Sequence, residues 1–386
     1  MKTSKILIFI NSLTCGGAER VASTLAGYLA RSGCAVIVVT MQGREKDFYR
    51  LDQRVTRYCL DTAYDKPFLG KILVNIGNFR RLRRILLRDK PDVVLGMMTK
   101  CAVMSILTGL GLPVRVVVSE RNFPGQKRIA WLLAQQRRLL YRHADALAAQ
   151  TTEEAKWLKR YVAAANIEVI PNAVFWPLPA AEPVIPPRDW LDSGDKVVLA
   201  AGRLSQQKGF DLLIRAFSMI GTHRDGWKLV IIGKDGDAGD PGTRGHLVQL
   251  VQDLGLEGRV LLPGLVGNIG DWYERADMFV LSSRYEGFPN VLLEAMACGR
   301  PCIAFDCDTG PRDLIRSGEN GLLVPSLDVT ALSRAMEQLM NDQDYRTMLA
   351  QRAVSVRERF SEEAVMGKWK RLLGIEAYCG GLESVT

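Results

Sequence analysis

Short apolar runs separated by amphipathic stretches make up the hydrophobic pattern of the chain, and this pattern occurs twice. In the first half, runs such as KILIFI (residues 5–10) and RVVVS (115–119) lack polar alternation, which is typical of strands buried on both faces. Segments with helical spacing separate these runs, as in a parallel sheet built from βαβ units. The pattern restarts at KVVLAAG (196–202), and helical stretches at about 329–340 and 345–374 close the chain. The sequence therefore predicts two doubly wound α/β domains.

A proline-rich segment separates the two patterns. Six of the sixteen prolines lie between residues 171 and 187, and such a segment forms neither a helix interior nor a central strand. We therefore expect a first domain over residues 1–172, a linker over 173–195 and a second domain over 196–360. Two doubly wound halves imply a cleft that faces the carboxyl ends of both sheets.

Composition indicates a globular protein with more than one core. The chain has 386 residues, of which 47% are hydrophobic and 24% charged, so it exceeds what one ordinary core organises. Its apolar runs are strand-length and fall far short of the ~20 residues that span a bilayer. The eight cysteines are scattered and match no zinc-ligand spacing. We therefore expect free thiols in a reducing cytoplasm and no metal site.

Positive charge is concentrated in the first half of the chain. Residues 1–171 contain 28 lysines and arginines against 13 acidic residues, although the whole chain carries only +9. Such asymmetry indicates that this half meets an anionic surface, either a membrane or nucleic acid. The alternative is a solvated basic face. Because no nucleic-acid-binding motif occurs and the aromatic residues are not interleaved with the arginines, we expect an anionic membrane surface and no specific nucleic acid.

Two basic residues follow the first strand of the second pattern. Arg203 and Lys208, in AAGRLSQQKGF, lie between that strand and the opening of a helix. The free amides of a helix N-terminus favour anions. A guanidinium and an ammonium added there make a site for two negative charges, such as a diphosphate. A solvated arginine and lysine in a loop are the alternative.

Two glutamates, Glu286 and Glu294, lie in the segment SSRYEGFPNVLLEAMACGRP. The first falls in a turn after a strand, and the second near the middle of a short helix that starts around Pro289. Position i+4 holds Asn290 after the first and Cys298 after the second, so neither has a basic partner there. Carboxylates in such apolar surroundings need hydrogen-bond donors, and sugar or ribose hydroxyls would supply them. A buried hydrogen bond to the backbone is the alternative.

The segment LTCGGAER (13–20) follows the first predicted strand, where a phosphate-binding turn lies in nucleotide-binding folds. It lacks the G-x-G-x-x-G spacing and the P-loop lysine, but Gly16 and Gly17 allow a close backbone approach to a ligand. The alternative is a tight strand-to-helix turn without a ligand. Because Glu19 would repel a phosphate, we expect its side chain to point away.

Two basic amphipathic stretches, residues 71–90 and 127–144, lie in the basic half. In the first of them, arginines fill much of the surface between apolar residues at helical spacing. The apolar residues are Ile72, Leu73, Ile76, Phe79, Leu82 and Leu86, and the arginines are Arg80, Arg81, Arg83, Arg84 and Arg88. Helices of this kind lie on anionic lipid or hold a polyprenyl diphosphate. The alternative is a surface helix whose apolar stripe packs on the sheet.

In this order, the motifs GRL…K, EGFPNVLLEAMACGRP with its E-x7-E spacing, and NGLLVP resemble the family 4 glycosyltransferases. These are retaining nucleotide-sugar enzymes of GT-B fold. The resemblance runs from Lys5 to at least Phe360. It implies two Rossmann-like domains that face each other across a cleft, with a final helix in residues 361–386 that crosses back onto the first domain.

The resemblance also implies a role for each motif residue. Arg203 and Lys208 would grip the donor diphosphate, and Glu294 would bond the ribose hydroxyls. Glu286 would hold the donor sugar and diphosphate together with the backbone of the donor-binding positions Phe288, Pro289, Asn290 and Val291. The backbone at Gly16 and Gly17 would approach the donor from the first domain. We expect Arg203, Lys208 and Glu286 to be the catalytic residues.

A retaining transfer must stabilise the departing nucleoside diphosphate, and the positive charge of Arg203 and Lys208 does so without a divalent metal or another cofactor. Glu120, in VVVSERNFP, ends a strand of the first domain and is a candidate to orient the acceptor hydroxyl. Enzymes of this family often carry a histidine near that point, where Arg121 or Asn122 stands in this chain. The residues expected on the acceptor side are Glu120, Arg80, Arg81 and Arg84.

The segments GGAER and SER and the arginine-rich helix look like a subgroup that extends lipid-linked oligosaccharides or exopolysaccharide repeat units. This subgroup includes bacterial N-acetylgalactosaminyl transferases. The resemblance thus implies transfer of a hexose or N-acetylhexosamine from a nucleotide-sugar, expected to be UDP-linked. The expected acceptor is a polyprenyl-diphosphate-linked glycan at the cytoplasmic face of the cell membrane. The alternatives are a GT-B transferase with a soluble acceptor, a related epimerase and a basic nucleic-acid-binding protein.

Overall fold

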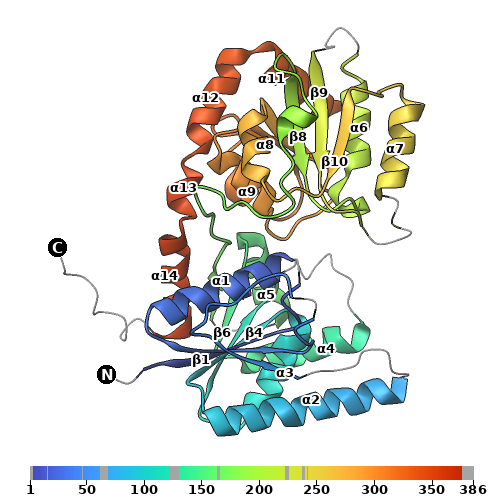
Figure 1. Cartoon of the computed structure of the whole chain (residues 1–386). Coiled ribbons are helices and arrows are strands. Elements are labelled where there is room, and N and C mark those ends of the chain that lie inside the picture. Colours follow the sequence, from blue (N-terminus) through green and yellow to red (C-terminus); the bar gives the residue numbers. More distant parts are fainter. Residues whose placement is uncertain are drawn as a thin grey trace, which may run out of the picture. The chain divides into compact units, whose positions relative to one another are not determined.

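The computed structural model describes most of the chain, with side chains from residue 73 onward in the helix that begins at Phe68. The described residues are 3–14, 16–45, 47–60, 68–121, 123, 130–162, 166–221, 226–236, 240 and 242–375. They form two compact units (Figure 1). The first comprises the chain up to Asn172 together with the residues from Glu363 onward, and the second comprises Ala173–Glu362.

The sheet of the first unit contains seven strands among the described residues, in the order β3-β2-β1-β4-β5-β6-β7. All neighbouring strands are parallel. The order reverses between β1 and β4, so the sheet is doubly wound, and ligands bind at the carboxyl edge of such sheets. The strands are β1 (Lys5–Ile10), β2 (Ala35–Thr40), β3 (Thr56–Cys59), β4 (Val93–Met97), β5 (Arg115–Ser119), β6 (Ala146–Ala149) and β7 (Ile167–Val169).

Helices cover both faces of this sheet, with α1 on one face and α2 and α3 on the other (Figure 1). The alternating side chains of the strands explain this arrangement, because Leu7, Phe9 and Val39 pack against Leu82 and Leu86 of α2. The helices are α1 (Gly17–Arg31), α2 (Phe68–Asp89), α3 (Thr99–Gly109), α4 (Trp131–Leu140), α5 (Thr152–Val162) and α14 (Glu362–Leu373).

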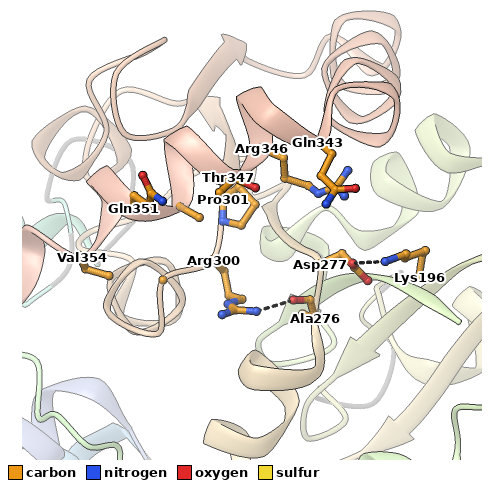
Figure 2. A pocket seen from close by; sticks show the side chains of 12 residues that line it. Lys196, Ala276, Asp277, Arg300, Pro301, Gln343, Arg346, Thr347, Gln351 and Val354 are labelled. Carbon is orange, nitrogen blue, oxygen red and sulfur yellow. Dashed lines mark hydrogen bonds and ion pairs between the residues drawn. The ribbon is translucent and has the colours of Figure 1, made fainter. Parts of the chain in front are cut away.

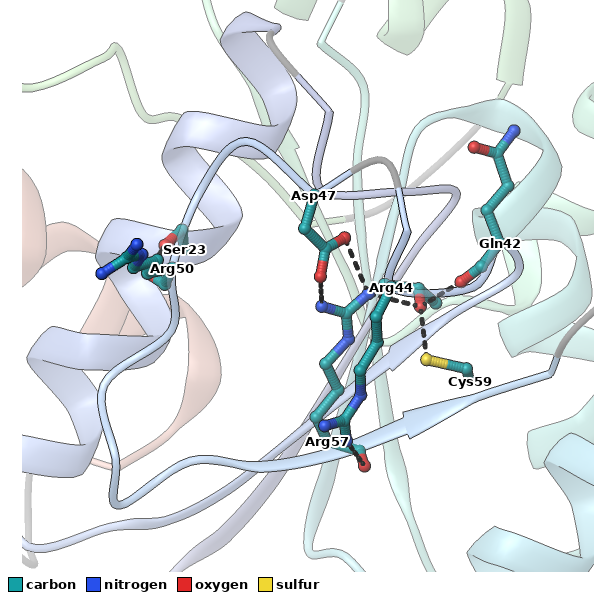
Figure 3. A network of polar contacts seen from close by, with 8 residues as sticks. Ser23, Gln42, Arg44, Asp47, Arg50, Arg57 and Cys59 are labelled. Atoms are coloured by element: carbon teal, nitrogen blue, oxygen red, sulfur yellow. Dashed lines mark hydrogen bonds and ion pairs between the residues drawn. The ribbon is translucent and has the colours of Figure 1, made fainter. Parts of the chain in front are cut away.

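Strand β3, which the sequence pattern does not predict, is held by a polar network (Figure 3). Arg57 on β3 donates two hydrogen bonds to the Asp47 carboxylate and a third to Thr40 Oγ1 at 3.1 Å. The Thr40 hydroxyl in turn donates to Gln42 O at 2.7 Å. Charge pairing between Arg57 and Asp47 therefore helps to hold β3 in place. This explains why β3 forms although its sequence has no apolar run.

The sheet of the second unit contains six strands within the described part of the chain, in the order β10-β9-β8-β11-β12-β13. All pairs are again parallel, and the order reverses between β8 and β11. The carboxyl ends of β8 and β11 therefore form the switch point of this sheet. The strands are β8 (Lys196–Ala201), β9 (Trp227–Ile232), β10 (Val260–Gly264), β11 (Met278–Leu281), β12 (Cys302–Asp306) and β13 (Leu322–Pro325).

Two hydrophobic clusters cover the two faces of the second sheet. Val198 and Ala200 of β8 belong to one cluster, and Val197 and Leu199 belong to the other. Alternate residues of a strand point to opposite faces, so this strand is buried on both sides, as its apolar run predicts. The helices are α6 (Phe210–Ser218), α7 (Arg244–Asp253), α8 (Ile269–Arg275), α9 (Asn290–Ala297), α10 (Pro311–Leu314), α11 (Val329–Asn341), α12 (Gln343–Ala353) and α13 (Val356–Arg359).

The proline-rich segment packs onto the second unit. Val174 and Leu191 are buried in its core, and the backbone of Ile185 is held at both its polar atoms. Its amide donates to Asn268 Oδ1 at 2.9 Å, and its carbonyl accepts from Trp272 Nε1 at 2.9 Å. The segment expected to be a linker thus forms part of a domain surface. The prediction of two doubly wound α/β units is confirmed.

Candidate active site

Arg203 and Lys208 follow β8 at the carboxyl edge of the second sheet. The chain turns through a short 3-10 helix at Gln206–Lys208 and enters α6 through Gly209. Gly209 has a φ of 62°, and a Cβ at this position would lie 2.1 Å from Ser282 O. Only glycine fits this close approach, which brings the turn that carries Lys208 against the loop after β11.

Lys208 and Glu286 form an ion pair between these two loops. The Lys208 Nζ lies 2.6 Å from Glu286 Oε1, and the side chains are 17% and 6% exposed. The Ser283 hydroxyl donates to the same oxygen at 2.6 Å. The structure therefore brings together two of the three side chains expected to be catalytic, and it adds Ser283, which motif reasoning missed.

Arg203 extends into solvent from the same turn. Within the described ranges, its guanidinium makes no hydrogen bond or ion pair, and its side chain is exposed. An exposed guanidinium without a partner keeps its full capacity to bind an anion. The turn after β8 thus presents one partnered and one unpartnered cation.

Glu294 lies on α9 and is buried. The Tyr273 hydroxyl lies 3.4 Å from Glu294 Oε2 and donates to Val291 O at 3.0 Å. Burial, followed by the neighbouring Glu294 charge, raises the pKa of Tyr273 well above its ordinary value. The tyrosine therefore stays protonated beside the carboxylate, and no local sequence signal identifies it.

The predicted donor-binding positions 288–291 form the start of α9. Pro289 is the residue before the first helical turn, and Asn290 and Val291 are the first helical residues. The Phe288 ring packs 5.9 Å from the Phe360 ring, centroid to centroid, inside the core. The Phe288 side chain is therefore buried in the core and is not available to a ligand. Any contact of Phe288 with the donor would come from its backbone.

Gly16 and Gly17 form the turn between β1 and α1, and Gly16 is extended, with a φ of −162°. A Cβ at Gly16 would lie 2.3 Å from Glu19 Oε2. The Glu19 carboxylate therefore folds back against Gly16, and its orientation relative to a donor phosphate stays a prediction. The short i+3 spacing within the first helical turn explains this position.

Glu120 follows β5 and is 4% exposed. The Thr99 hydroxyl lies 2.9 and 3.1 Å from its two oxygens, and the Tyr141 hydroxyl donates to Oε1. A carboxylate accepts hydrogen bonds and donates none, and these three bonds orient the Glu120 side chain. Thr99 and Tyr141 come from distant parts of the chain and were not identified from the sequence.

A buried charged cluster lies beside Glu120 at the ends of β5 and β6. Burial lowers the pKa of Arg121 to about 10 and raises the pKa of Glu154 to about 8. Arg121 donates to Asn172 Oδ1, and the backbone N–H of Gln150 donates to Glu154 Oε2 at 2.7 Å. Glu154 is therefore largely protonated at neutral pH, which reduces the negative charge buried in this cluster.

Helix α2 carries the three arginines expected on the acceptor side. Arg80, Arg81 and Arg84 are exposed, and Arg81 donates to Leu60 O. Leu73 and Ile76 are 70% and 43% exposed. They are not part of the buried apolar stripe, which contains Leu82 and Leu86, and Ile72 lies outside the described side chains. The exposed face of α2 is thus both basic and apolar.

A pocket of about 450 Å³ opens at the amino ends of β8, β11 and β12 (Figure 2). Lys196 pairs there with Asp277 at 3.2 Å, and Arg300 donates to Ala276 O at 2.9 Å. None of the residues expected to bind the donor lines this pocket, so it lies at the wrong edge of the sheet for the chemistry above.

Among the described residues, no three histidine, cysteine, aspartate or glutamate side chains are grouped as a metal site. Within the same residues, every helix is too short or too polar to cross a membrane.

Two family models match the chain. The model Glycosyltransferase Family 4 matches residues 15–174, and the model Glycosyl transferases group 1 matches residues 185–356. An exopolysaccharide phosphotransferase of Streptomyces coelicolor is 30% identical over 92% of this chain, which spans 39% of that protein. A Campylobacter jejuni enzyme is 28% identical over 96% of this chain and 98% of its own length. Its name describes an alpha-1,4-N-acetyl-D-galactosaminyltransferase that acts on a GalNAc-containing glycan on PP-undecaprenol.

A solved structure shares the fold. The Anabaena protein HepE, in complex with UDP and glucose, superposes with a TM-score of 0.79 at 20% identity, covering 96% of this chain and 99% of that chain. The predicted GT-B fold, with two Rossmann-like domains, is confirmed. The chain thus consists of a Glycosyltransferase Family 4 domain followed by a Glycosyl transferases group 1 domain, in the GT-B fold.

Proposed function

We propose that this glycosyltransferase moves a hexose or N-acetylhexosamine from a UDP-linked donor to a glycan carried on a polyprenyl diphosphate. The transfer retains the anomeric configuration, needs neither a metal nor another cofactor, and takes place at the cytoplasmic face of the cell membrane. The two N-terminal glycines, Gly16 and Gly17, approach the donor from the first domain.

The ion pair between Lys208 and Glu286 is the observation that carries this proposal. It places an ammonium and a carboxylate side by side at the switch point of the second sheet, 2.6 Å apart. A nucleotide-sugar carries the two complementary groups next to each other. Its diphosphate is an anion that pairs with an ammonium, and its sugar has hydroxyls that donate to a carboxylate. Lys208 and the exposed Arg203 bind the diphosphate, and Glu286 accepts from sugar hydroxyls.

The same positive charge supplies the catalysis. In the transition state the bond to the leaving diphosphate breaks and negative charge grows on its terminal oxygen. Arg203 and Lys208 stabilise that charge more than they stabilise the bound donor, and this difference is what accelerates a reaction. Glu294, buried on α9 beside Tyr273, accepts from the ribose hydroxyls and so fixes the nucleoside.

The relatives support the donor and acceptor classes. The Anabaena structure contains UDP and glucose, and the name of the Campylobacter enzyme specifies an undecaprenol-diphosphate glycan as its acceptor. On this chain, the exposed face of α2 combines arginines with Leu73 and Ile76. A basic and apolar face of this kind suits a lipid diphosphate and an anionic bilayer. Glu120 orients the acceptor hydroxyl.

The donor site is tested by calorimetric titration of UDP into the wild-type chain and into Arg203→Ala and Lys208→Ala. Charge-assisted hydrogen bonds contribute about 1.5–3 kcal/mol, so each variant should lose roughly tenfold to a hundredfold in affinity. Lys196→Gln, which removes an ion pair at the opposite edge of the same sheet, is the control and should bind UDP normally. Unchanged UDP affinity in both site variants would contradict the proposed donor site.

A further inference from the structure

Hydrogen bonds flanking Lys208 join the turn after β8 to the loop after β11. The two strands are neighbours in the sheet, so the loops emerge side by side. The Arg284 amide donates to Gln207 O at 2.8 Å, and the Ser282 hydroxyl donates to Lys208 O at 3.0 Å. The backbone on both sides of the Lys208 side chain is therefore fixed by the loop that carries Glu286.

The Arg284 side chain adds a third connection, to α6. Its Nη1 donates to Gln206 O at 2.7 Å and to Asp211 Oδ1 at 2.8 Å, and its Nη2 donates to Asp211 Oδ2 at 2.7 Å. Asp211 lies in the first turn of α6. One guanidinium thus bridges three segments, and the two-bond geometry is one that lysine does not reproduce.

The pair between Arg284 and Asp211 is charged and only partly hydrated. The two side chains are 25% and 32% exposed. Burial alone would raise the pKa of Asp211, but the hydrogen bonds and charge of Arg284 outweigh this, and the pKa is lowered. The bonds to Asp211 in turn raise the pKa of Arg284. The connection therefore persists throughout the neutral pH range.

A lysine ammonium sits at the end of a flexible four-carbon side chain. Its position is therefore defined only when the backbone that carries it is fixed. Lys208 meets Glu286 at 2.6 Å although 78 residues separate them in the chain. The turn also leaves no room for adjustment, since a Cβ at Gly209 would strike Ser282 O.

We propose that Arg284 and Asp211 are positioning residues that hold Lys208 and Glu286 as one preorganised unit. Neither touches the donor. They act by fixing the distance between the cation that binds the diphosphate and the carboxylate that binds the sugar. This inference rests on the proposed donor role of Lys208 and Glu286.

The test compares Arg284→Gln, Arg284→Lys and Asp211→Asn with wild type in three measurements, which are affinity for UDP, affinity for UMP, and kcat. UMP lacks the second phosphate, so it reports on folding and nucleoside binding without the Lys208 contact. Displacing a catalytic group by about 1 Å costs on the order of a hundredfold in rate. We expect Arg284→Gln to lower UDP affinity and kcat at least about tenfold and to leave UMP affinity within about twofold.

Arg284→Lys should recover little, because it keeps the charge and loses the two-bond geometry. The double variant Arg284→Gln/Asp211→Asn should lose no more than the worse single variant, since both break one connection. Lys196→Gln is the control and should match wild type.

Equal losses for UDP and UMP, or kinetics unchanged from wild type, would overturn the positioning role. Failure of the proposed function gives a different result: Lys208→Ala itself would then leave UDP affinity unchanged, and the inference would fall with it.

Discussion

Lys208 and Glu286 show how far single residues can be predicted from the sequence. Their chemistry is readable from GRL…K and the E-x7-E element, because charged residues in apolar surroundings need partners. Their partners are not readable in the same way. Ser283 contacts Glu286 because of how the loops pack, and Tyr273 contacts Glu294 because of how α8 packs. Nothing in the local sequence identifies either residue as a partner.

Glu154 carries a prediction about pH. Burial raises its pKa from the ordinary value of 4.5 to about 8 in the folded state. Between these two pH values the folded chain holds a proton that the unfolded chain has released, so the free energy of unfolding falls as pH rises through this window. Glu154→Gln removes that proton exchange.

Urea unfolding of wild type and Glu154→Gln at pH 5 and pH 8 measures this effect. The stability of the variant relative to wild type should increase from pH 5 to pH 8. A difference between the two proteins that stays constant across the window would show that Glu154 is ionised in the fold.

At the scale of elements, the sequence predicts the buried strands well and the edges poorly. Strands such as β1 and β8 are buried on both faces and therefore appear as uninterrupted apolar runs. Strand β3 is missed because it is a half-exposed edge strand whose central arginine pairs with Asp47. The helical stretch expected over residues 345–374 is divided among α12, α13 and α14.

Helix α2 shows why periodicity alone does not assign a face. Its apolar residues recur at helical spacing along the whole helix, yet Leu82 and Leu86 are buried while Leu73 and Ile76 are exposed. The spacing predicts the helix correctly, but it does not separate the buried stripe with Leu82 and Leu86 from the apolar residues on the exposed face.

The exposed face of α2 predicts binding to anionic membranes. The triple variant Arg80→Gln/Arg81→Gln/Arg84→Gln removes three positive charges, each contributing about 1 kcal/mol at an anionic surface. In flotation with vesicles that contain anionic lipid, wild type should float with the vesicles and the triple variant should stay largely at the bottom.

Leu87→Gln, a change on the same exposed face that leaves all three arginines in place, separates the contribution of charge from that of apolar area. Wild type that fails to float with anionic vesicles would favour the soluble-acceptor alternative.

For the whole molecule, the repeated apolar pattern is enough to predict two doubly wound units, since parallel sheets need helices on both faces. The packing of the proline-rich segment is not predictable in this way. It depends on Asn268 and Trp272, which hold the backbone of Ile185. The two family models, which match different halves of the chain, agree with the two-unit architecture.

The central claim is that this chain transfers a sugar from a UDP-linked donor to a lipid-linked glycan through Arg203 and Lys208. The most direct test incubates the chain with radiolabelled UDP-hexoses and UDP-N-acetylhexosamines and with polyprenyl-diphosphate glycans, and then measures label in the organic-extractable fraction. The account predicts label transfer by wild type and by Lys196→Gln, and a loss of at least about a hundredfold in Lys208→Ala. Transfer by Lys208→Ala at the wild-type rate would contradict it, as would wild type that transfers label from none of these donors.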